Sequence, residues 1–211
     1  MNAVTQSSVA RAARRISNDA EAIGAARTFA ATIAPDAAAR ERERRLPYAE
    51  LDVYSATGLW GIARAAFADA RRFVRERARP CIDNGVERAS DDPLTLELFG
   101  TLAVDLDAAG ALTERAGSRV NAAIDGANAR TVAAASIAVA KARAATTEIA
   151  LAASSRLLEL AGTQGALAEH ALDRHWRNAR THTLHDPVRW KYVAIADHYL
   201  NDALPPRHGA L

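Results

Sequence analysis

The sequence has little from which to build disulfides or membrane spans. It holds a single cysteine, Cys81, among 211 residues, which excludes an internal disulfide and fits a reducing compartment. No hydrophobic run reaches the length of a membrane span, and residues 1–15 lack the apolar stretch of a signal peptide. The 27 basic and 25 acidic residues nearly balance, which argues against nucleic acid and anionic membranes as partners. We therefore expect a cytoplasmic protein with no membrane and no nucleic-acid partner.

The sequence is also poor in aromatic residues, at 5%, and no stretch shows the sustained alternation of β-branched and aromatic residues that marks a strand. Alanine is abundant instead, and it is both the best helix former and small enough to let helices approach closely. Hydrophobic residues still make up 49% of the chain, which suffices for a core at this length. These features predict an all-α fold, a bundle of long antiparallel helices with an N-terminal helical appendage.

Glycine and proline mark the helix boundaries in the first half of the chain. We expect a short helix over residues 48–57, closed by Gly58. A strongly basic helix over 63–79 follows and ends at Pro80, which cannot continue it. Residues 81–93 then read as a loop.

Two long helices follow this loop. Residues 90–93, Ser-Asp-Asp-Pro, indicate the entry to a helix over about 94–128, and the sequence from Gly126 to Asn128 breaks it. The next helix, over about 130–161, carries few charges and many small residues, so it should lie at the centre of the bundle. Because this helix is too apolar to face water on any side, we also expect a homo-oligomer.

Specific side-chain chemistry is concentrated in residues 172–200. This stretch holds two of the three tryptophans, two of the four tyrosines and four of the six histidines. Arg174, Arg177 and Arg180 recur at a spacing that places them near one face of a helix over 170–180.

The end of that helix is marked by a change of composition. Residues 181–184 predict a non-helical dip, after which Asp186 can cap a last helix and Pro187 can occupy its first turn. The last helix carries an apolar stripe at helical spacing, formed by Val188, Tyr192, Ile195 and Tyr199. The residues alone thus predict a helix, a corner and a last helix docked on the bundle.

The segment 174–187, RHWRNARTHTLHDP, resembles the C-terminal signature of the acyl-CoA dehydrogenase superfamily. It is most similar to the branch of the sulfur-acquisition oxidoreductases and the dibenzothiophene-monooxygenase-like flavin monooxygenases. Residues 40–62, RERERRLPYAELDVYSATGLWGI, resemble the end of the N-terminal helical domain of that branch. After Ile62 the relatives enter a middle β-domain, whereas this chain continues into a segment like the first helix of their C-terminal domain. The resemblance implies a remnant of the N-terminal domain over 1–62, a C-terminal bundle domain over 63–211, and deletion of the β-domain between them.

The same resemblance suggests cofactor-binding residues. Arg77 matches the arginine that reaches the phosphate part of the flavin, FMN or FAD, and an arginine fork pairs well with phosphate oxygens. Gly162 and Gly165 match a glycine-rich turn that approaches the flavin nucleotide across a subunit interface, where glycine permits close backbone approach. From the residues alone, Arg77 is equally a solvated arginine on a basic helix, and the glycines are equally a helix end.

His185 and Asp186 are the candidate catalytic residues. The register from Arg177 puts Asp186 where the dehydrogenases carry the glutamate that removes an α-proton, but here an aspartate followed by proline stands there. This departure favours the monooxygenase-like branch, in which a histidine near the flavin would assist its oxygen chemistry or move a substrate proton. His182 and His185 also form an H-x-x-H pair, but no cysteine or carboxylate cluster supplies further ligands, so we expect no metal.

The resemblance implies a flavin-dependent oxidoreductase or monooxygenase that acts on small organic, organosulfur substrates and assembles as a dimer or tetramer. The missing β-domain forms one wall of the flavin pocket in the relatives, so we expect flavin binding to be weak or absent and activity to be impaired. The alternative is a non-catalytic helical remnant that only self-associates. A nucleic-acid-binding bundle rests on the basic helix over 63–79 alone and conflicts with the balanced charge.

Overall fold

A computed structural model of the chain describes Gly24, Arg27 and residues 48–185 and 187–205. Most of the predicted N-terminal appendage and Asp186 therefore lie outside the described residues. The chain divides into two compact units, Met1–Ala37 and Ala38–Leu211. Every element considered below belongs to the second unit.

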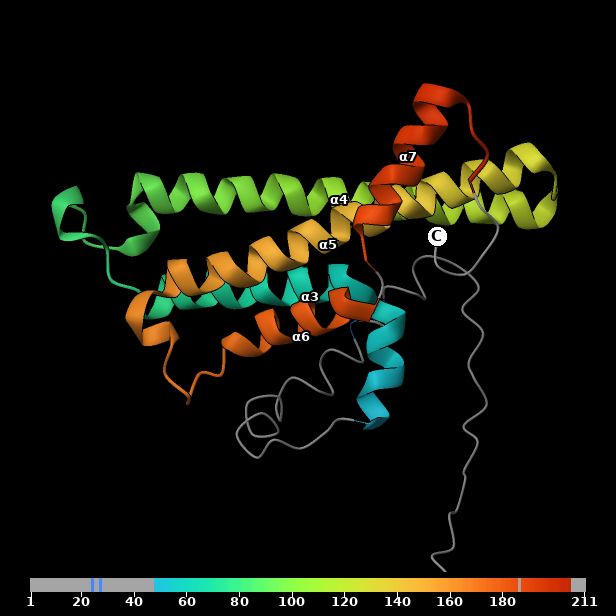
Figure 1. Ribbon diagram of the computed structural model, residues 1–211. Coiled ribbons are helices and arrows are strands. Elements are labelled where there is room, and N and C mark those ends of the chain that lie inside the picture. The colour runs from blue at the N-terminus through green and yellow to red at the C-terminus, as the bar shows by residue number, and fades with distance from the viewer. Residues whose placement is uncertain (1–23, 25–26, 28–47, 186, 206–211) are drawn as a thin grey trace, which may run out of the picture. The chain divides into compact units, whose positions relative to one another are not determined.

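The described part of the second unit consists of helices joined by short turns (Figure 1). The elements are α3 (Tyr48–Glu76), the 3₁₀ turns η1 (Ile82–Asn84) and η2 (Ala89–Asp91), α4 (Pro93–Asp125), α5 (Ala129–Gly165), α6 (Asp173–His185) and α7 (Arg189–Asn201). The all-α class is confirmed, and the residues described contain no strand. None of the described helices combines the length and the hydropathy needed to cross a bilayer.

Helix α5 lies at the centre, as its composition predicted. It contacts α3, α4, α6 and α7, and Figure 1 shows it running between α4 on one side and α3 on the other. Ala140, Ala150 and Ser154 on this helix have no exposed surface, and the Ser154 hydroxyl donates a hydrogen bond to the Ala150 carbonyl at 2.6 Å. Small side chains thus bring the neighbouring helices close without leaving a buried polar group unsatisfied.

Two glycines bend the long helices. Gly58 in α3 has φ 60° and ψ −171°, and Gly162 in α5 has φ 63° and ψ −161°. Residues with a side chain essentially never adopt this conformation, so each glycine produces a kink rather than a clean end. The proposed boundary between residues 62 and 63 falls inside the straight part of α3 after Gly58, and the two-block division of the chain stays a prediction.

The α4–α5 hairpin begins and turns where the sequence predicted. The Asp92 side chain accepts a hydrogen bond from the Leu94 amide at 2.9 Å, so it caps α4. Asn128 Oδ1 accepts from the Thr131 amide while Thr131 Oγ1 accepts from the Asn128 amide, each at 3.0 Å. This reciprocal capping box starts α5 immediately after α4 ends at the turn around Gly126.

The main hydrophobic core lies where α3, α4 and α5 meet. Its buried members include Leu59 and Phe73 of α3, Leu102 of α4, and Ile149 and Leu157 of α5. Trp60 closes one edge of this core, because its indole Nε1 donates to the Leu106 carbonyl at 3.2 Å. A Cβ at Gly110 would stand 3.1 Å from the indole ring, so glycine leaves the space that Trp60 occupies.

The core narrows toward the tip of the α4–α5 hairpin. There the buried cluster consists of Ala116, Ala138 and Ala142, with half-buried Leu112 against it. Alanine burial contributes little apolar area, so this end of the hairpin is held less strongly than the end against α3.

The predicted non-helical dip at residues 181–184 is wrong, because α6 continues through them to His185. Two contacts support the extra turn. The Thr183 hydroxyl donates to the Arg180 carbonyl at 2.8 Å, and Arg143 of α5 lies 3.1 Å from His182 Nε2. The start of α6 also differs, at Asp173 instead of residue 170, since Ala171 adopts a left-handed conformation with φ 47°.

The apolar stripe predicted for the last helix is only partly covered. Tyr192 and Tyr199 of α7 are 46% and 62% exposed, whereas Lys191 is the residue of α7 that is fully buried, at 3%. The position that precedes α7 is Val188, whose side chain makes no capping hydrogen bond. The proposed cap, Asp186, lies outside the described residues.

Candidate functional site

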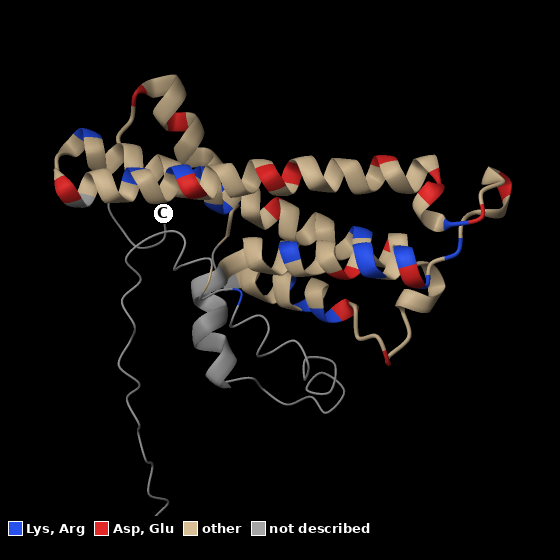
Figure 2. Cartoon of the chain, turned by 180° about the vertical axis from the view of Figure 1, so that it is seen from behind, with Lys and Arg blue, Asp and Glu red and all other residues tan. Residues whose placement is uncertain are grey.

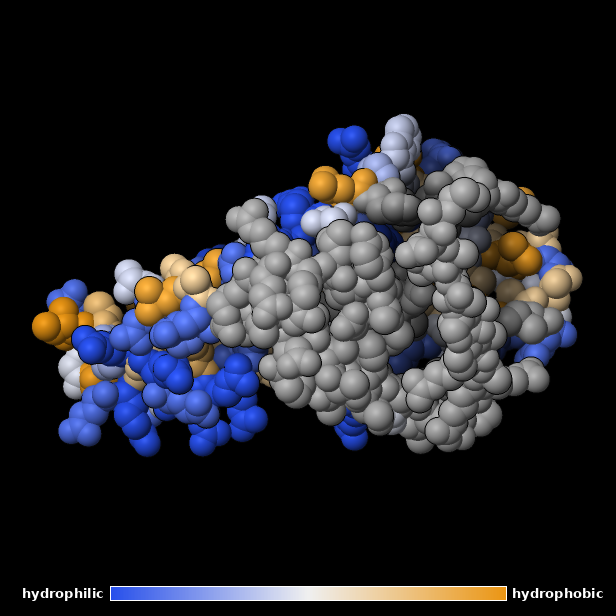
Figure 3. Space-filling model, turned by 90° about the horizontal axis from the view of Figure 1, so that it is seen from below, coloured by the Kyte–Doolittle hydropathy of each residue, from blue (hydrophilic) through white to orange (hydrophobic). Residues whose placement is uncertain are grey.

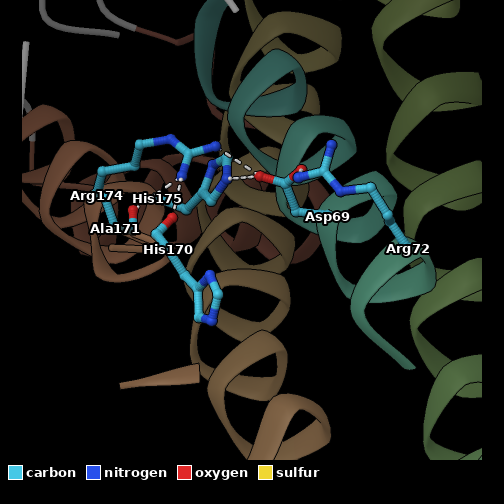
Figure 4. A network of polar contacts seen from close by, with 6 residues as sticks. All are labelled: Asp69, Arg72, His170, Ala171, Arg174 and His175. Carbon is cyan, nitrogen blue, oxygen red and sulfur yellow. Dashed lines mark hydrogen bonds and ion pairs between the residues drawn. The ribbon is translucent and has the colours of Figure 1, made fainter. Parts of the chain in front are cut away.

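A buried carboxylate joins α3 to α6 (Figure 4). Asp69 Oδ2 accepts hydrogen bonds from Arg174 Nη2 at 2.6 Å and from His175 Nε2 at 2.8 Å. Its other oxygen, Oδ1, accepts from Arg72 Nη2 at 2.7 Å. We call these four residues, Asp69, Arg72, Arg174 and His175, the Asp69 network.

Local structure brings the partners of Asp69 into place. Asp69 lies between Ala66 and Phe73 on the buried face of α3, so its carboxylate is carried into the core with them. The left-handed Ala171 turns the chain just before α6, and Arg174 Nη1 then donates to the Ala171 carbonyl at 2.8 Å. Arg174 thus ties the turn, its own helix and α3 together with one guanidinium.

The Asp69 network keeps its carboxylate ionised and its histidine neutral. Burial would raise the pKa of Asp69, but the hydrogen bond from His175 and the positive charges of Arg174 and Arg72 hold it below its usual value. Burial lowers the pKa of His175, and the charges of Arg174 and Arg72 add to this, which outweighs the opposing effect of Asp69. Because an ionised carboxylate only accepts, Nε2 of neutral His175 carries the proton.

The role that this geometry supports is to position α6. Asp69 and His175 are only 9% and 5% exposed, so a substrate has no access to them. Sequence reasoning missed the network, although a lone aspartate on an otherwise apolar helix face signals a buried partner. The sequence pattern placed Arg174, Arg177 and Arg180 near one face of a helix, but the three side chains have different partners. Arg177 pairs with Asp173 at 3.2 Å, and Arg180 lies over the Trp176 ring at 5.9 Å.

A second feature, the Arg77 cavity, lies where α3 ends and α4 begins. It has a volume of about 370 Å³, and Arg77, Arg79 and the turn from Gly162 to Gln164 are among its lining residues. This size falls within the range of small-molecule sites, about 300–1,000 Å³. Arg77 and Gly162, which the sequence proposed together as cofactor residues, therefore line one cavity.

The two glycines of the turn are required for different reasons. Gly162 has open space where a Cβ would lie, but its φ of 63° excludes other residues on backbone grounds. A Cβ at Gly165 would stand 2.5 Å from the Ala161 Cβ and 3.5 Å from Leu172, so its constraint is packing. Gly165 is buried and does not line the Arg77 cavity.

Positive charge dominates the polar groups available in the Arg77 cavity. Its two carboxylates are already engaged, because Asp92 caps α4 and Glu159 pairs with Arg156. Arg77 and Arg79 are exposed, and the described residues provide no ion-pair partner for the Arg77 guanidinium. Figure 3 shows mostly hydrophilic residues over this end of the unit, around the end of α3 and the start of α6. The cavity therefore suits an anionic group such as a phosphate.

Of the two candidate catalytic residues, His185 is the one that the structure describes, and it lies at the C-terminal end of α6. His185 is the last residue of that helix, whose 13 residues extend about 20 Å at 1.5 Å each. The turn with Gly162 precedes α6 and His185 ends it, and Figure 1 shows the last turn of α6 away from the last turn of α3, which Arg77 follows. His182, one turn before His185, contacts Arg143. Within residues 48–185 and 187–205, no three His, Cys, Asp or Glu side chains lie close enough to share a metal ion.

The bundle, with its corner between α6 and α7, is of the class found at the C-terminus of acyl-CoA dehydrogenases. The family "Acyl-CoA dehydrogenase, C-terminal domain" matches residues 53–190, which is more than half of the chain. The chain therefore belongs to this family, and the resemblance inferred from the C-terminal signature is confirmed.

Similar proteins narrow the branch. Dibenzothiophene monooxygenase of Mycolicibacterium goodii is 37% identical over 148 residues, which cover 69% of this chain and 36% of that protein. The probable FMNH2-dependent monooxygenase SfnC of Pseudomonas putida is 34% identical over 148 residues, which cover 69% of this chain and 38% of that protein.

Solved structures agree with this placement. Methanesulfinate monooxygenase MsuC from Pseudomonas fluorescens superposes with a TM-score of 0.70 at 33% identity, covering 72% of this chain and 40% of that one. FMN-bound TdsC from Paenibacillus sp. A11-2 gives a TM-score of 0.69 at 33% identity, covering 72% and 39%. The chain thus spans 36–40% of the length of these four relatives.

Proposed function

We propose that this chain is the helical, nucleotide-contacting part of a flavin-dependent monooxygenase that acts on small organosulfur compounds. The observation that carries the proposal is that Arg77 and the Gly162 turn line one cavity in a chain 33–37% identical to monooxygenases of this kind. The cofactor we propose is FMN, since SfnC is described as FMNH2-dependent and TdsC has been solved with FMN.

In this proposal the Arg77 cavity receives the phosphate end of the flavin. Arg77 supplies a charge-assisted fork, and the backbone at Gly162 allows close approach. The flavin would supply the redox chemistry when bound. His185, at the end of α6, and Asp186, the next residue in the sequence, would handle a substrate proton at the ring of a flavin held by another copy. This division of roles fits a glycine turn that acts across a subunit interface.

Because one copy would hold the flavin and another would supply the catalytic residues, the proposal requires a homo-oligomer, a dimer or tetramer. Helix α5, whose apolar character first suggested association, packs against α3, α4, α6 and α7 of its own chain. The exposed apolar surface that supports association lies on α7, where Trp190, Val193 and Leu200 are 62%, 54% and 80% exposed. Light scattering at micromolar concentration should give a mass of two or four chains, and a monomer mass would contradict the proposal.

A flavin titration tests the nucleotide site. We expect the purified protein to be colourless and to bind added FMN weakly and in a salt-dependent way, because the described residues contain no strand that could supply the contacts of a β-domain to the ring. FMN should bind at least about tenfold more tightly than riboflavin, which lacks the phosphate, since a hydrogen bond to a charged group contributes about 1.5–3 kcal/mol. Arg77→Gln should abolish that difference.

The matched control is Arg75→Gln, which removes the same charge from an exposed position of α3 outside the Arg77 cavity. It should leave the preference for FMN intact. Equal binding of FMN and riboflavin by the unaltered protein would favour the alternative, a helical remnant that only self-associates. A yellow protein with stoichiometric flavin would contradict the expected weakness of binding.

A further inference from the structure

A second cavity lies between α4, α5 and α7, at the hairpin end of the bundle. Its volume is about 300 Å³, and it shares no lining residue with the Arg77 cavity. Helix α4 provides Leu112, Arg115 and Arg119, and α5 provides the floor. Tyr199 of α7 forms a further wall. We call this the hairpin cavity.

The hairpin cavity is cationic in a chain whose total charge is nearly balanced. Its four cations are Arg115, Arg119, Arg130 and Lys141, and no Asp or Glu lines it. Figure 2 shows basic residues on the α4–α5 hairpin beside α7, separate from those on α3. Like charges this close repel one another, and Arg115 and Arg119 stand four residues apart on one helix. An anion between them would relieve that repulsion.

Most of these cations have no internal partner. Among the described residues, none of the guanidiniums of Arg115, Arg119 and Arg130 makes a hydrogen bond or ion pair, and all three residues are exposed. Lys141 is the exception, because its Nζ lies 2.6 Å from the Tyr199 hydroxyl and 4.4 Å from the centre of the Tyr199 ring. The contact holds the ring of Tyr199 against the cavity while leaving the Lys141 charge uncompensated.

The floor of the hairpin cavity is apolar. Ile137 and Ala138 of α5 are 4% and 7% exposed, and half-buried Leu112 and Ala134 lie beside them. Together with the Tyr199 ring, they form a surface that favours an aromatic or aliphatic body. A simple inorganic anion would leave this surface uncovered, and a volume of about 300 Å³ is at the small end for ligand sites.

We propose that the hairpin cavity binds a small organic anion of one or two rings, with its acidic group among the arginines and Lys141 and its apolar body on the Ile137 floor. This site is additional to the proposed flavin site. Its ligand is recognised by charge and apolar contact together, so an arenesulfonate or arenecarboxylate fits and a neutral ring does not.

Calorimetric titration of the full chain with naphthalene-2-sulfonate tests the site. Naphthalene-2-sulfonamide provides the neutral isostere, and sulfate provides the anion without a body. We expect saturable binding of the sulfonate and binding at least tenfold weaker for the other two. Equal binding of sulfate would overturn the proposed ligand class, and equal binding of the sulfonamide would overturn the role of the cations.

Substitution of the cationic residues tests whether the sulfonate binds in the hairpin cavity. The double change Arg115→Gln and Arg119→Gln should weaken sulfonate binding at least tenfold, and Lys141→Gln should weaken it independently. The double change Arg71→Gln and Arg75→Gln alters net charge equally on exposed α3 positions and should leave binding unchanged. If both double variants lose affinity equally, binding follows net charge and the site is refuted. Thermal melts confirm that each variant folds.

Variants at the two cavities distinguish sulfonate binding in the hairpin cavity from flavin binding in the Arg77 cavity. Arg77→Gln should leave sulfonate affinity unchanged, and the Arg115 and Arg119 changes should leave FMN affinity unchanged. Sulfonate affinity should also be independent of protein concentration. A fall in affinity as the protein associates would show that a second copy covers the cavity, and it would overturn the proposal of a small ligand.

Discussion

The two ends of the bundle bury their polar groups in opposite ways. Where α3 meets α6, Asp69 is enclosed and receives hydrogen bonds from Arg72, Arg174 and His175. Where α7 meets the hairpin, the paired groups, such as Lys141 with Tyr199, lie at the surface. The first end is held by a large core and a satisfied ionic network, whereas the second depends on alanine contacts and exposed pairs. The first end therefore holds the helices in place, whereas the second offers surface for ligands or another chain.

The largest contrast should come from the core. Leu157→Ala removes a side chain with no exposed surface at the α3 end, and we expect it to lower the free energy of unfolding by about 3 kcal/mol. Leu200→Ala changes an 80% exposed residue of α7 and should cost less than about 0.5 kcal/mol. Urea denaturation measures both. Similar losses would mean that α7 is as firmly packed as α5.

The ionic network should give the next largest effect. Asp69→Asn leaves the half-buried Arg174 without its counter-charge, and breaking such a pair costs about 3 kcal/mol or somewhat less where one partner reaches solvent. The matched change at the other end is Glu148→Gln, because Glu148 accepts a hydrogen bond from Tyr192 at 3.4 Å near the surface. It should shift the free energy of unfolding by less than about 0.5 kcal/mol. A small loss for Asp69→Asn would contradict the positioning role of the network.

The smallest effect is a pH dependence. The pKa of His175 is lower in the folded chain than its ordinary value of about 6.5, so the unfolded state binds the proton first as the pH falls. Stability from this residue is complete above pH 6.5 and is lost progressively below it. The lowered pKa of Asp69 adds a further loss only when the pH falls below the ordinary aspartate value of 3.8.

His175→Gln tests that dependence, because glutamine can donate to Asp69 without titrating. The variant should lose less stability than the unaltered chain between pH 6.5 and 5, as measured by urea midpoints. Leu200→Ala provides the control, since it changes an exposed side chain that does not titrate and should leave the slope unchanged. Identical slopes for the unaltered chain and His175→Gln would contradict the neutral state assigned to His175.

Much of the fold follows from local signals in the sequence. The glycines at 58 and 162, the helix entry at residues 90–93 and the break from Gly126 to Asn128 all act within a few residues. All were predicted as helix boundaries, although the two glycines kink their helices instead of ending them. The prediction of a non-helical dip at residues 181–184 was wrong because tertiary contacts outweighed the low helix propensity of these residues. Threonine and histidine are weak helix formers, but the contact of His182 with Arg143, 39 residues away, accompanies a continuous helix.

The sequence predicted residues of the candidate site only where they belong to a motif shared with a known family. Arg77 and Gly162 were proposed from resemblance, and they line one cavity. The Asp69 network was missed because Asp69 is 105 residues from Arg174 and 106 from His175, and no periodicity in one helix encodes its partner in another. The hairpin cavity was missed for the same reason, since Arg115, Lys141 and Tyr199 come from three helices.

Hydrogen exchange followed by mass spectrometry tests the difference between the two ends most directly. At concentrations low enough to keep the chain monomeric, amides of α6 and of α5 around Leu157 should exchange only through global unfolding. Amides of α7 should exchange at least about tenfold faster, since an opening that is 1.4 kcal/mol easier gives that ratio. Protection of α7 should then rise with protein concentration as its exposed face is covered. Equal protection of α6 and α7 in the monomer would contradict the claim that α6 is held more firmly than α7.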